Sequence, residues 1–216
     1  ERKTRGGIKI TDEFSILAAT SQFGSLTPEA EARWRLVETA WALNMPRQCL
    51  TVEYDKHREL LVMDRQFGQR TSITGCRDAL NGYQKGKCFY CFDDISIETG
   101  DSNLADVDHF FPYRLRTSDS DIRNLDGVWN LVLTCKNCNR GSNGKFDKIP
   151  EIKFLNRLST RNDFLISSHH PLRETLIIQT GNSERQREHF LQTCYNDAKN
   201  ILIHSWKPED EHPPAF

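Results

Sequence analysis

The sequence has no long apolar run. Its apolar stretches, such as residues 131–133 and 176–178, are far shorter than the roughly 20 residues that a membrane-spanning helix needs. Residues 1–7 are polar and begin with Glu1, so they contain no apolar leader segment of a secretory signal. We therefore expect a chain without a transmembrane helix, derived from a longer or processed protein and located in the cytoplasm.

An excess of positive charge is also missing. The 216 residues include 29 Lys and Arg against 30 Asp and Glu, a net charge of −1, so any surface that binds nucleic acid must be local. One local stretch, residues 135–161, holds seven basic and two acidic side chains. It is either a nucleic-acid contact or an ordinary solvated surface.

The cysteines cannot form a complete set of disulfides, because there are seven of them. Four lie in two CxxC pairs, namely Cys88 with Cys91 and Cys135 with Cys138, whereas Cys49, Cys76 and Cys194 are isolated. Two CxxC pairs suit a tetrahedral Zn²⁺ ion, and a closed set of four thiolates indicates a structural role. The isolated cysteines are expected to be buried thiols in a reducing compartment.

Hydrophobic periodicity predicts the elements around these pairs. We expect a helix over 27–43, a strand, turn and strand over 49–62, a helix over 72–83, an amphipathic stripe from Ile152 to Leu158, and a longer helix over 183–203. Residues 207–216 are expected to form a poorly ordered tail. This predicts an α+β, helix-rich fold with an N-terminal helical and hairpin region (1–84), a core (85–150), C-terminal helices that pack on the core (151–206) and a tail (207–216).

The segment between the cysteine pairs carries further polar motifs. Asp106-Val107-Asp108-His109 precedes Phe110-Phe111-Pro112, Asn130 heads a short apolar run before Cys135, and Asn139-Arg140-Gly141 follows Cys138. This order resembles the HNH nuclease family over about residues 88–148, under a third of the chain. Asn139 stands where the family has its last histidine, as in HNN members that include the HNH domains of RNA-guided nucleases.

The resemblance implies a ββα-metal, treble-clef-like core stapled by a zinc ion on the four cysteines, and an endonuclease that hydrolyses DNA, with 5′-phosphate and 3′-hydroxyl products. His109 would be the general base that activates water, because an imidazole can accept a proton near neutral pH. Asp108 and Asn139 would supply oxygen ligands to one Mg²⁺ or Mn²⁺. Asn130 would brace the loop that carries the base, and phosphate would be held by Lys136, Arg140 or Lys145.

Two other functions stay open at this point. The chain could be a zinc-stapled module that binds nucleic acid without cutting it, or an RNase. Double-stranded DNA is the expected partner, and other domains or subunits of a bacterial defence complex are a setting suggested by analogy alone. His169 and His170, which precede Pro171, are expected to pack in a loop rather than to belong to the site.

Overall fold

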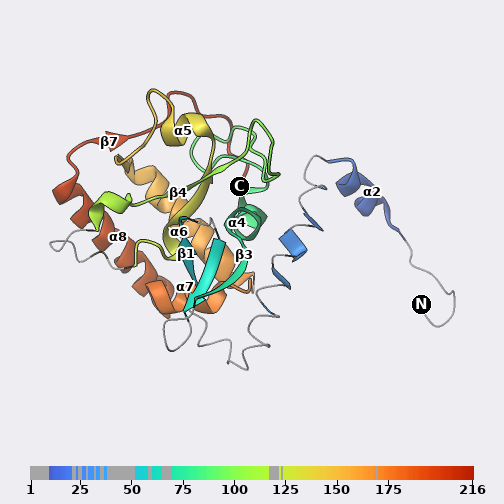
Figure 1. The fold of residues 1–216 in the computed structure, drawn as a ribbon, viewed down its shortest axis with the longest axis horizontal. Helices are drawn as coiled ribbons and strands as arrows, with labels where there is room; N and C mark the ends of the chain where they lie inside the picture. Colours follow the sequence, from blue (N-terminus) through green and yellow to red (C-terminus); the bar gives the residue numbers. More distant parts are fainter. Residues whose placement is uncertain are drawn as a thin grey trace.

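The structure is a computed structural model that describes most of the chain. It covers residues 10–20, 52–57, 60–64, 70–116, 122, 124–168 and 170–216, together with residues 23, 26, 27, 29–31, 33, 34 and 37. Figure 1 shows how these parts are arranged. Among them, no helix is both long and apolar enough to cross a membrane.

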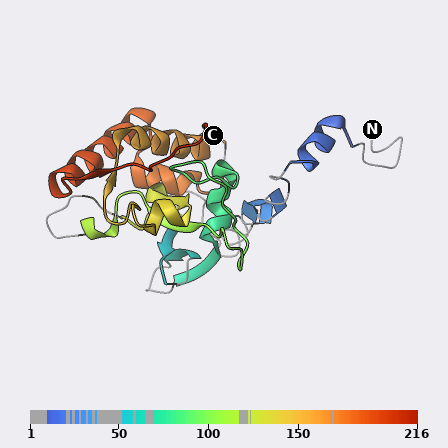
Figure 2. The same ribbon diagram turned by 90° about the horizontal axis from the view of Figure 1, so that it is seen from above.

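The N-terminal part contains one peripheral helix and a small sheet. Helix α2 (Asp12–Ala18) has no buried residue and lies apart from the other elements in both views (Figures 1 and 2). Strands β1 (Val52–Asp55), β2 (Leu60–Asp64) and β3 (Arg70–Gly75) form an antiparallel sheet in that order. The β1–β2 turn begins at Asp55, whose Oδ1 accepts a hydrogen bond of 3.0 Å from the His57 backbone N–H, a contact typical of a tight turn.

Helix α4 (Cys76–Gln84) links this sheet to the central segment. Its last residue, Gln84, exchanges two hydrogen bonds with the backbone of Leu133, of 2.7 and 2.8 Å, and so completes one edge of strand β5 (Leu131–Thr134). Strand β4 (Asp106–His109) pairs antiparallel with the other edge of β5, with His109 opposite Leu131. Two 3₁₀ turns, η2 (Tyr113–Leu115) and η3 (Val128–Asn130), lie between these strands in the sequence, and α5 (Lys136–Arg140) follows them.

The C-terminal part is a layer of helices. Helices α6 (Ile152–Ser167), α7 (Arg173–Thr180) and α8 (Glu184–Ile201) contact one another, and Figure 2 shows them in orange to red on the side away from the β1–β3 sheet. Short strands β6 (Ile149–Pro150) and β7 (Ser205–Trp206) pair in parallel. Helix α8 begins with a capping box, in which Ser183 and Gln186 bond each other's backbone N–H groups.

The buried core joins the two cysteine pairs to the helical layer. Phe89, Phe110, Phe111 and Trp129 are fully buried among the aliphatic residues of β5, α6 and α7. Arg161 of α6 is also buried and donates to the carbonyl oxygens of Val128, Trp129 and Leu131; burial lowers its pKa to about 10. A polar side chain of the helical layer thereby fixes the segment that precedes β5.

Much of the sequence-based expectation is confirmed. The fold is α+β, strands β1 and β2 pair as the expected hairpin within the described residues, α8 corresponds to the helix expected near 183–203, and Cys76 and Cys194 are buried. The helix expected over 27–43 lies largely outside the described residues, although Glu29 and Arg33 within it are helical. Cys49 and His169 also lie outside them. His170 packs in a loop as predicted: it is buried, and its Nδ1 accepts a hydrogen bond of 3.1 Å from the Leu172 N–H.

Two expectations are wrong. The helix predicted over 72–83 begins only at Cys76, because residues 70–75 form the third strand of the sheet; the β-branched residues of this run favour a strand. The tail is not loose either. The N–H of His212 donates to the Cys91 carbonyl, Glu211 pairs with Lys153 and Arg157, and Phe216 packs against Tyr83 and Phe92.

Candidate functional site

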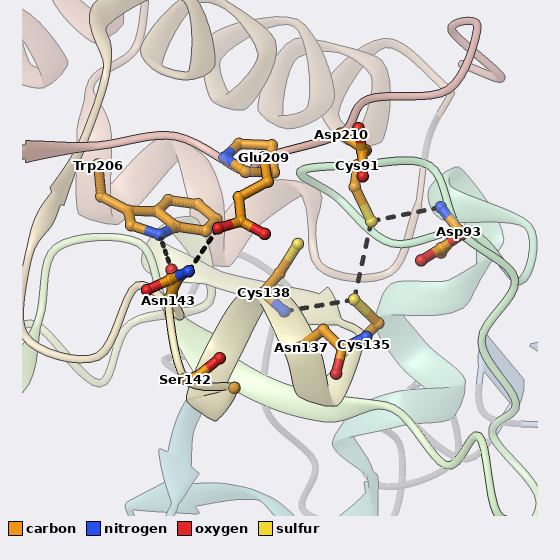
Figure 3. A pocket seen from close by; sticks show the side chains of 12 residues that line it. Cys91, Asp93, Cys135, Asn137, Cys138, Ser142, Asn143, Trp206, Glu209 and Asp210 are labelled. Atoms are coloured by element: carbon orange, nitrogen blue, oxygen red, sulfur yellow. Dashed lines mark hydrogen bonds between the residues drawn. The ribbon is translucent and has the colours of Figure 1, made fainter.

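The two cysteine pairs meet at one point. The sulfur atoms of Cys88, Cys91, Cys135 and Cys138 all lie within 4.8 Å of one another, and none of them is in a disulfide. In Figure 3 the sulfur atoms of Cys91, Cys135 and Cys138 point toward a common centre. Cys135 also caps α5, since its Sγ accepts from the Cys138 N–H. The cluster can therefore bind a metal ion such as Zn²⁺.

The charges of these sulfurs depend on one another. Hydrogen bonding with Cys135 raises the pKa of both Cys91 and Cys138, whereas the hydrogen bond from Cys138 lowers the pKa of Cys135. The four groups thus compete for negative charge. A divalent cation at their centre removes this competition, because it stabilises every thiolate at once.

A pocket beside the cluster is acidic. It has a volume of about 300 Å³ and is lined by Cys91, Cys135 and Cys138 together with Asp93, Glu209 and Asp210. Figure 3 shows Glu209 beside Asn143 at this pocket, where Trp206 Nε1 also donates to the Asn143 carbonyl. Three carboxylates would repel a phosphate, so this pocket itself does not suit nucleic acid.

His109 lies at the end of β4 and is nearly buried, with 8% of its side chain exposed. Its Nε2 is 2.9 Å from Oδ1 of Asp126, a carboxylate that also lies 3.6 Å from Nη1 of Arg116. The rings of Tyr54 and Tyr113 lie near the imidazole, with centroid distances of 5.8 and 6.1 Å. Because a carboxylate accepts hydrogen bonds, Nε2 carries the hydrogen and Nδ1 is left as the basic nitrogen.

Asn130 holds the chain that follows His109. Its Oδ1 accepts from the Phe111 N–H at 2.8 Å, and its Nδ2 donates to the carbonyls of Phe111 and Leu125 at 3.0 and 2.8 Å. These bonds tie the residues after β4 to the segment before β5. The geometry is that of a bracing residue, and its importance for catalysis stays a prediction.

Asp108 faces the other side of β4 and has protein partners for both oxygens. Tyr90 donates to Oδ2 at 2.9 Å, and Lys145 Nζ lies 3.0 Å from Oδ1. Burial, followed by the charge of Asp108, raises the pKa of Tyr90 well above its ordinary value, so the phenol stays a donor. Lys145 Nζ also donates to the carbonyl of His109 at 2.8 Å, which links the two halves of the Asp-His pair.

Asn139 contacts β4 at Asp106, which lies two residues before Asp108. Its Nδ2 donates to Oδ2 of Asp106 at 3.0 Å, and Arg140 Nε donates to the same oxygen at 2.8 Å. Residues two apart on a strand share a face, so Asp106, Asp108 and Asn139 lie on one side of β4. The structure therefore gathers the predicted ligands on one face, with Asp106 as the direct neighbour of Asn139.

The basic side chains are less available than the sequence suggested. Lys145, one of the predicted phosphate contacts, is fully buried against Asp108, which does not fit that role. Arg161 is buried, and Lys153 and Arg157 are paired with Glu211. Arg140 and Lys136 remain exposed, although Arg140 bonds Asp106 and Lys136 bonds the Ser102 carbonyl.

Four residues that contact the site were not predicted from the sequence, namely Tyr54, Tyr90, Tyr113 and Asp126, which stand outside the DH, Asn and NRG motifs. Three of them meet the site because the fold brings distant segments together, whereas Tyr113 follows His109 by four residues. Asp106 was visible as part of the Asp-Val-Asp-His run and could have been identified, because alternate residues of a strand face the same side.

Comparison of the chain with protein-family models, with curated proteins and with solved structures gives no match.

Proposed function

We propose that this protein is a metal-dependent endonuclease that hydrolyses DNA phosphodiester bonds with His109 as the general base. The observation that carries the proposal is the pairing of His109 Nε2 with Asp126 at 2.9 Å. A histidine held in one tautomer by a carboxylate has its second nitrogen ready to accept a proton. The strand, strand and helix formed by β4, β5 and α5, with the four-cysteine cluster beside them, support the resemblance to HNH nucleases.

In this proposal each residue has a separate task. Nδ1 of His109 takes a proton from a water molecule as the water attacks phosphorus, and Asp126 stabilises the imidazolium that forms. Asn130 keeps the backbone after His109 in place. Arg140 and Lys136, the exposed basic residues of α5, contact phosphate groups of the DNA.

Asp106 and Asp108 on one face of β4, with Asn139 of α5 against them, fit a hard divalent cation in donor chemistry, because carboxylate and amide oxygens are the ligands that Mg²⁺ and Mn²⁺ prefer. We propose Asp108 and Asn139 as ligands and add Asp106, which contacts Asn139 directly. The cation, when bound, supplies positive charge for the developing phosphorane and the leaving 3′ oxygen.

The test uses the zinc-loaded protein with supercoiled plasmid and with RNA, each with and without Mg²⁺ or Mn²⁺. We expect nicking or linearisation of the plasmid only with metal, and 5′-phosphate ends. Brief EDTA treatment abolishes cutting while the fold survives, because a partly hydrated Mg²⁺ is held far less tightly than a zinc ion bound by four thiolates. If RNA is degraded and the plasmid is not, the protein is an RNase and the DNA assignment is wrong.

One observation favours a second candidate, a module that binds nucleic acid without cutting it. Both oxygens of Asp108 are already occupied by Tyr90 and Lys145, as in a purely structural buried pair. This candidate predicts salt-dependent retention of DNA and an intact plasmid at every concentration of Mg²⁺ or Mn²⁺.

A further inference from the structure

A large cleft opens next to His109. It has a volume of about 960 Å³, and its walls are the β1–β2 turn, η2 and the segment around Asp126. Tyr54, Tyr113 and Asp126 line it, and all three also contact His109. A group bound in this cleft would therefore lie beside the proposed general base.

Tyr113 is the exposed aromatic side chain of the cleft, with 42% of its surface accessible. Two cations lie over its ring: Lys56 Nζ is 5.7 Å and Arg116 Cζ 5.4 Å from the ring centroid, so a base that stacks on the ring displaces one of them. Arg116 Nη1 also donates to the Tyr113 hydroxyl at 2.6 Å, which fixes the ring. Asp55 and Asp126 also line the cleft, and Arg116 lies 3.6 Å from Asp126, so the two cations balance the acidic side chains and do not outnumber them. The feature that matches a nucleobase site is the fixed, partly exposed ring of Tyr113, since proteins stack unpaired bases on such rings.

We propose that this cleft binds an unpaired nucleotide of the substrate, with its base stacked on Tyr113 and the adjoining phosphates near Lys56 and Arg116. The inference rests on the proposed nuclease function and narrows its substrate class. A base within a duplex has both faces covered by its neighbours, so it reaches a protein ring only when it is single-stranded or flipped out. The preferred substrate is thus DNA with single-stranded character at the cut.

The position of the ring supports a role at the cut itself. The centroids of the Tyr113 and His109 rings are 6.1 Å apart, so a base stacked on Tyr113 belongs to a nucleotide next to the phosphate that His109 serves. The β1–β2 turn supplies Lys56 and His57 to the same cleft. This gives the N-terminal hairpin a substrate-binding task that the nuclease motif does not contain.

The test is binding without added Mg²⁺ or Mn²⁺, measured by fluorescence anisotropy on a labelled single-stranded oligodeoxynucleotide and on the same sequence as a full duplex. We expect tighter binding of the single strand. Tyr113→Ala should weaken single-strand binding about 5-fold to 160-fold, the range for loss of one base–aromatic stack, whereas Tyr113→Trp should keep it. Phe14→Ala, which removes an exposed aromatic from α2, serves as the matched control and should bind like wild type.

Zinc content and melting temperature of Tyr113→Ala are measured first, so that a folding defect is recognised. The inference is overturned if folded Tyr113→Ala binds the single strand as tightly as the wild-type protein does. It is also overturned if the wild-type protein binds the duplex more tightly than the single strand. Plasmid cutting with Mg²⁺ is scored separately. If the plasmid is cut but Tyr113→Ala binds the single strand like wild type, only this inference is wrong. If Tyr113→Ala weakens binding but no plasmid is cut, only the nuclease proposal is wrong.

Discussion

The side chains of Asp108 and His109 point to opposite faces of β4, and each meets a different set of partners. His109 contacts Asp126, which stands 17 residues further along the chain, while Asp108 contacts Tyr90 and Lys145, 18 and 37 residues away. These contacts separate the proposed proton transfer from the proposed metal face. They can be tested one residue at a time.

In the proposed mechanism Asp126 positions His109, with which it is in contact, and its removal should slow cutting without preventing DNA binding. We expect Asp126→Ala to lower the single-turnover rate by less than the 10²–10⁴-fold typical of losing a general base, and Asp126→Glu to restore part of it. Asp94→Ala, at a surface ion pair with Lys87, is the control. An unchanged rate in Asp126→Ala, or no recovery in Asp126→Glu, would show that Asp126 does not act through His109.

Lys145 is predicted to stabilise the fold through Asp108. Lys145→Met leaves a buried carboxylate with one partner fewer, and loss of one member of a buried pair costs about 3–5 kcal/mol. The double variant Asp108→Asn with Lys145→Met should lose less than the sum of the two single variants, because the uncompensated charge is gone. Urea unfolding of the four proteins measures this coupling. Additive losses would mean that the two side chains do not interact.

At the scale of elements, the cysteine cluster joins three parts of the chain. Phe89, which lies between Cys88 and Cys91, donates its N–H to the Leu133 carbonyl of β5. Cys135 caps α5, and the His212 N–H of the C-terminal segment donates to the Cys91 carbonyl. Loss of the cluster should therefore release β5, α5 and the last residues together.

Cys135→Ser tests this directly. A structural zinc site contributes on the order of 10 kcal/mol to folding in small domains, so we expect the variant to lose both zinc and a cooperative melting transition. Cys194→Ala, which removes a buried thiol outside the cluster, should keep its zinc. Metal analysis together with thermal melting decides the matter; bound zinc and an unchanged melting curve in Cys135→Ser would contradict the structural role.

Local patterns predicted some elements well and others badly for identifiable reasons. Helix α8 was predictable because Ser183 and Gln186 form a capping box before an amphipathic run. Residues 72–75 were misassigned to a helix because their pairing with β2 is not visible in local periodicity. The last residues looked like a tail because their charges have distant partners, such as Glu211 with Arg157.

At the scale of the whole molecule, the candidate site could likewise be predicted only where its signal is local in the sequence. The Asp-His, Asn and Cys motifs could be found because their spacing is local, and the four sulfurs do meet. The partners of those motifs could not be found, because Asp126, Tyr90 and Lys145 come from segments 17 to 37 residues away that only the tertiary fold brings together. The basic stretch was overestimated for the same reason, since burial of Lys145 and Arg161 depends on the tertiary fold.

Buried His170 makes the stability of the folded molecule depend on pH. Burial, with the nearby charges of Arg33 and Arg161, lowers its pKa to about 3, below the ordinary value near 6.5. Between about pH 6.5 and pH 3, His170 therefore binds a proton in the unfolded chain but not in the folded one. The free energy of unfolding that is present above about pH 6.5 is lost as the pH falls toward 3.

Between pH 7 and pH 5.5 this loss amounts to about 1 kcal/mol, a decrease of about 2–4 °C in melting temperature for a chain of this size. The variant His170→Asn keeps an acceptor for the Leu172 N–H but does not titrate, so its melting temperature should fall less over the same range. Equal decreases in both proteins would show that His170 is not responsible.

The most direct test of the proposed nuclease chemistry is single-turnover cutting of labelled DNA by His109→Ala, with Mg²⁺ or Mn²⁺ in excess. Zinc content, melting and DNA binding are checked beforehand, and His189→Ala, at an exposed histidine of α8, serves as the matched control. We expect a rate about 10²–10⁴-fold below wild type, with zinc and DNA affinity retained, because His109 is not a zinc ligand and phosphate contacts come from other residues. A rate within about threefold of wild type, far outside that general-base range, would contradict the assignment of His109.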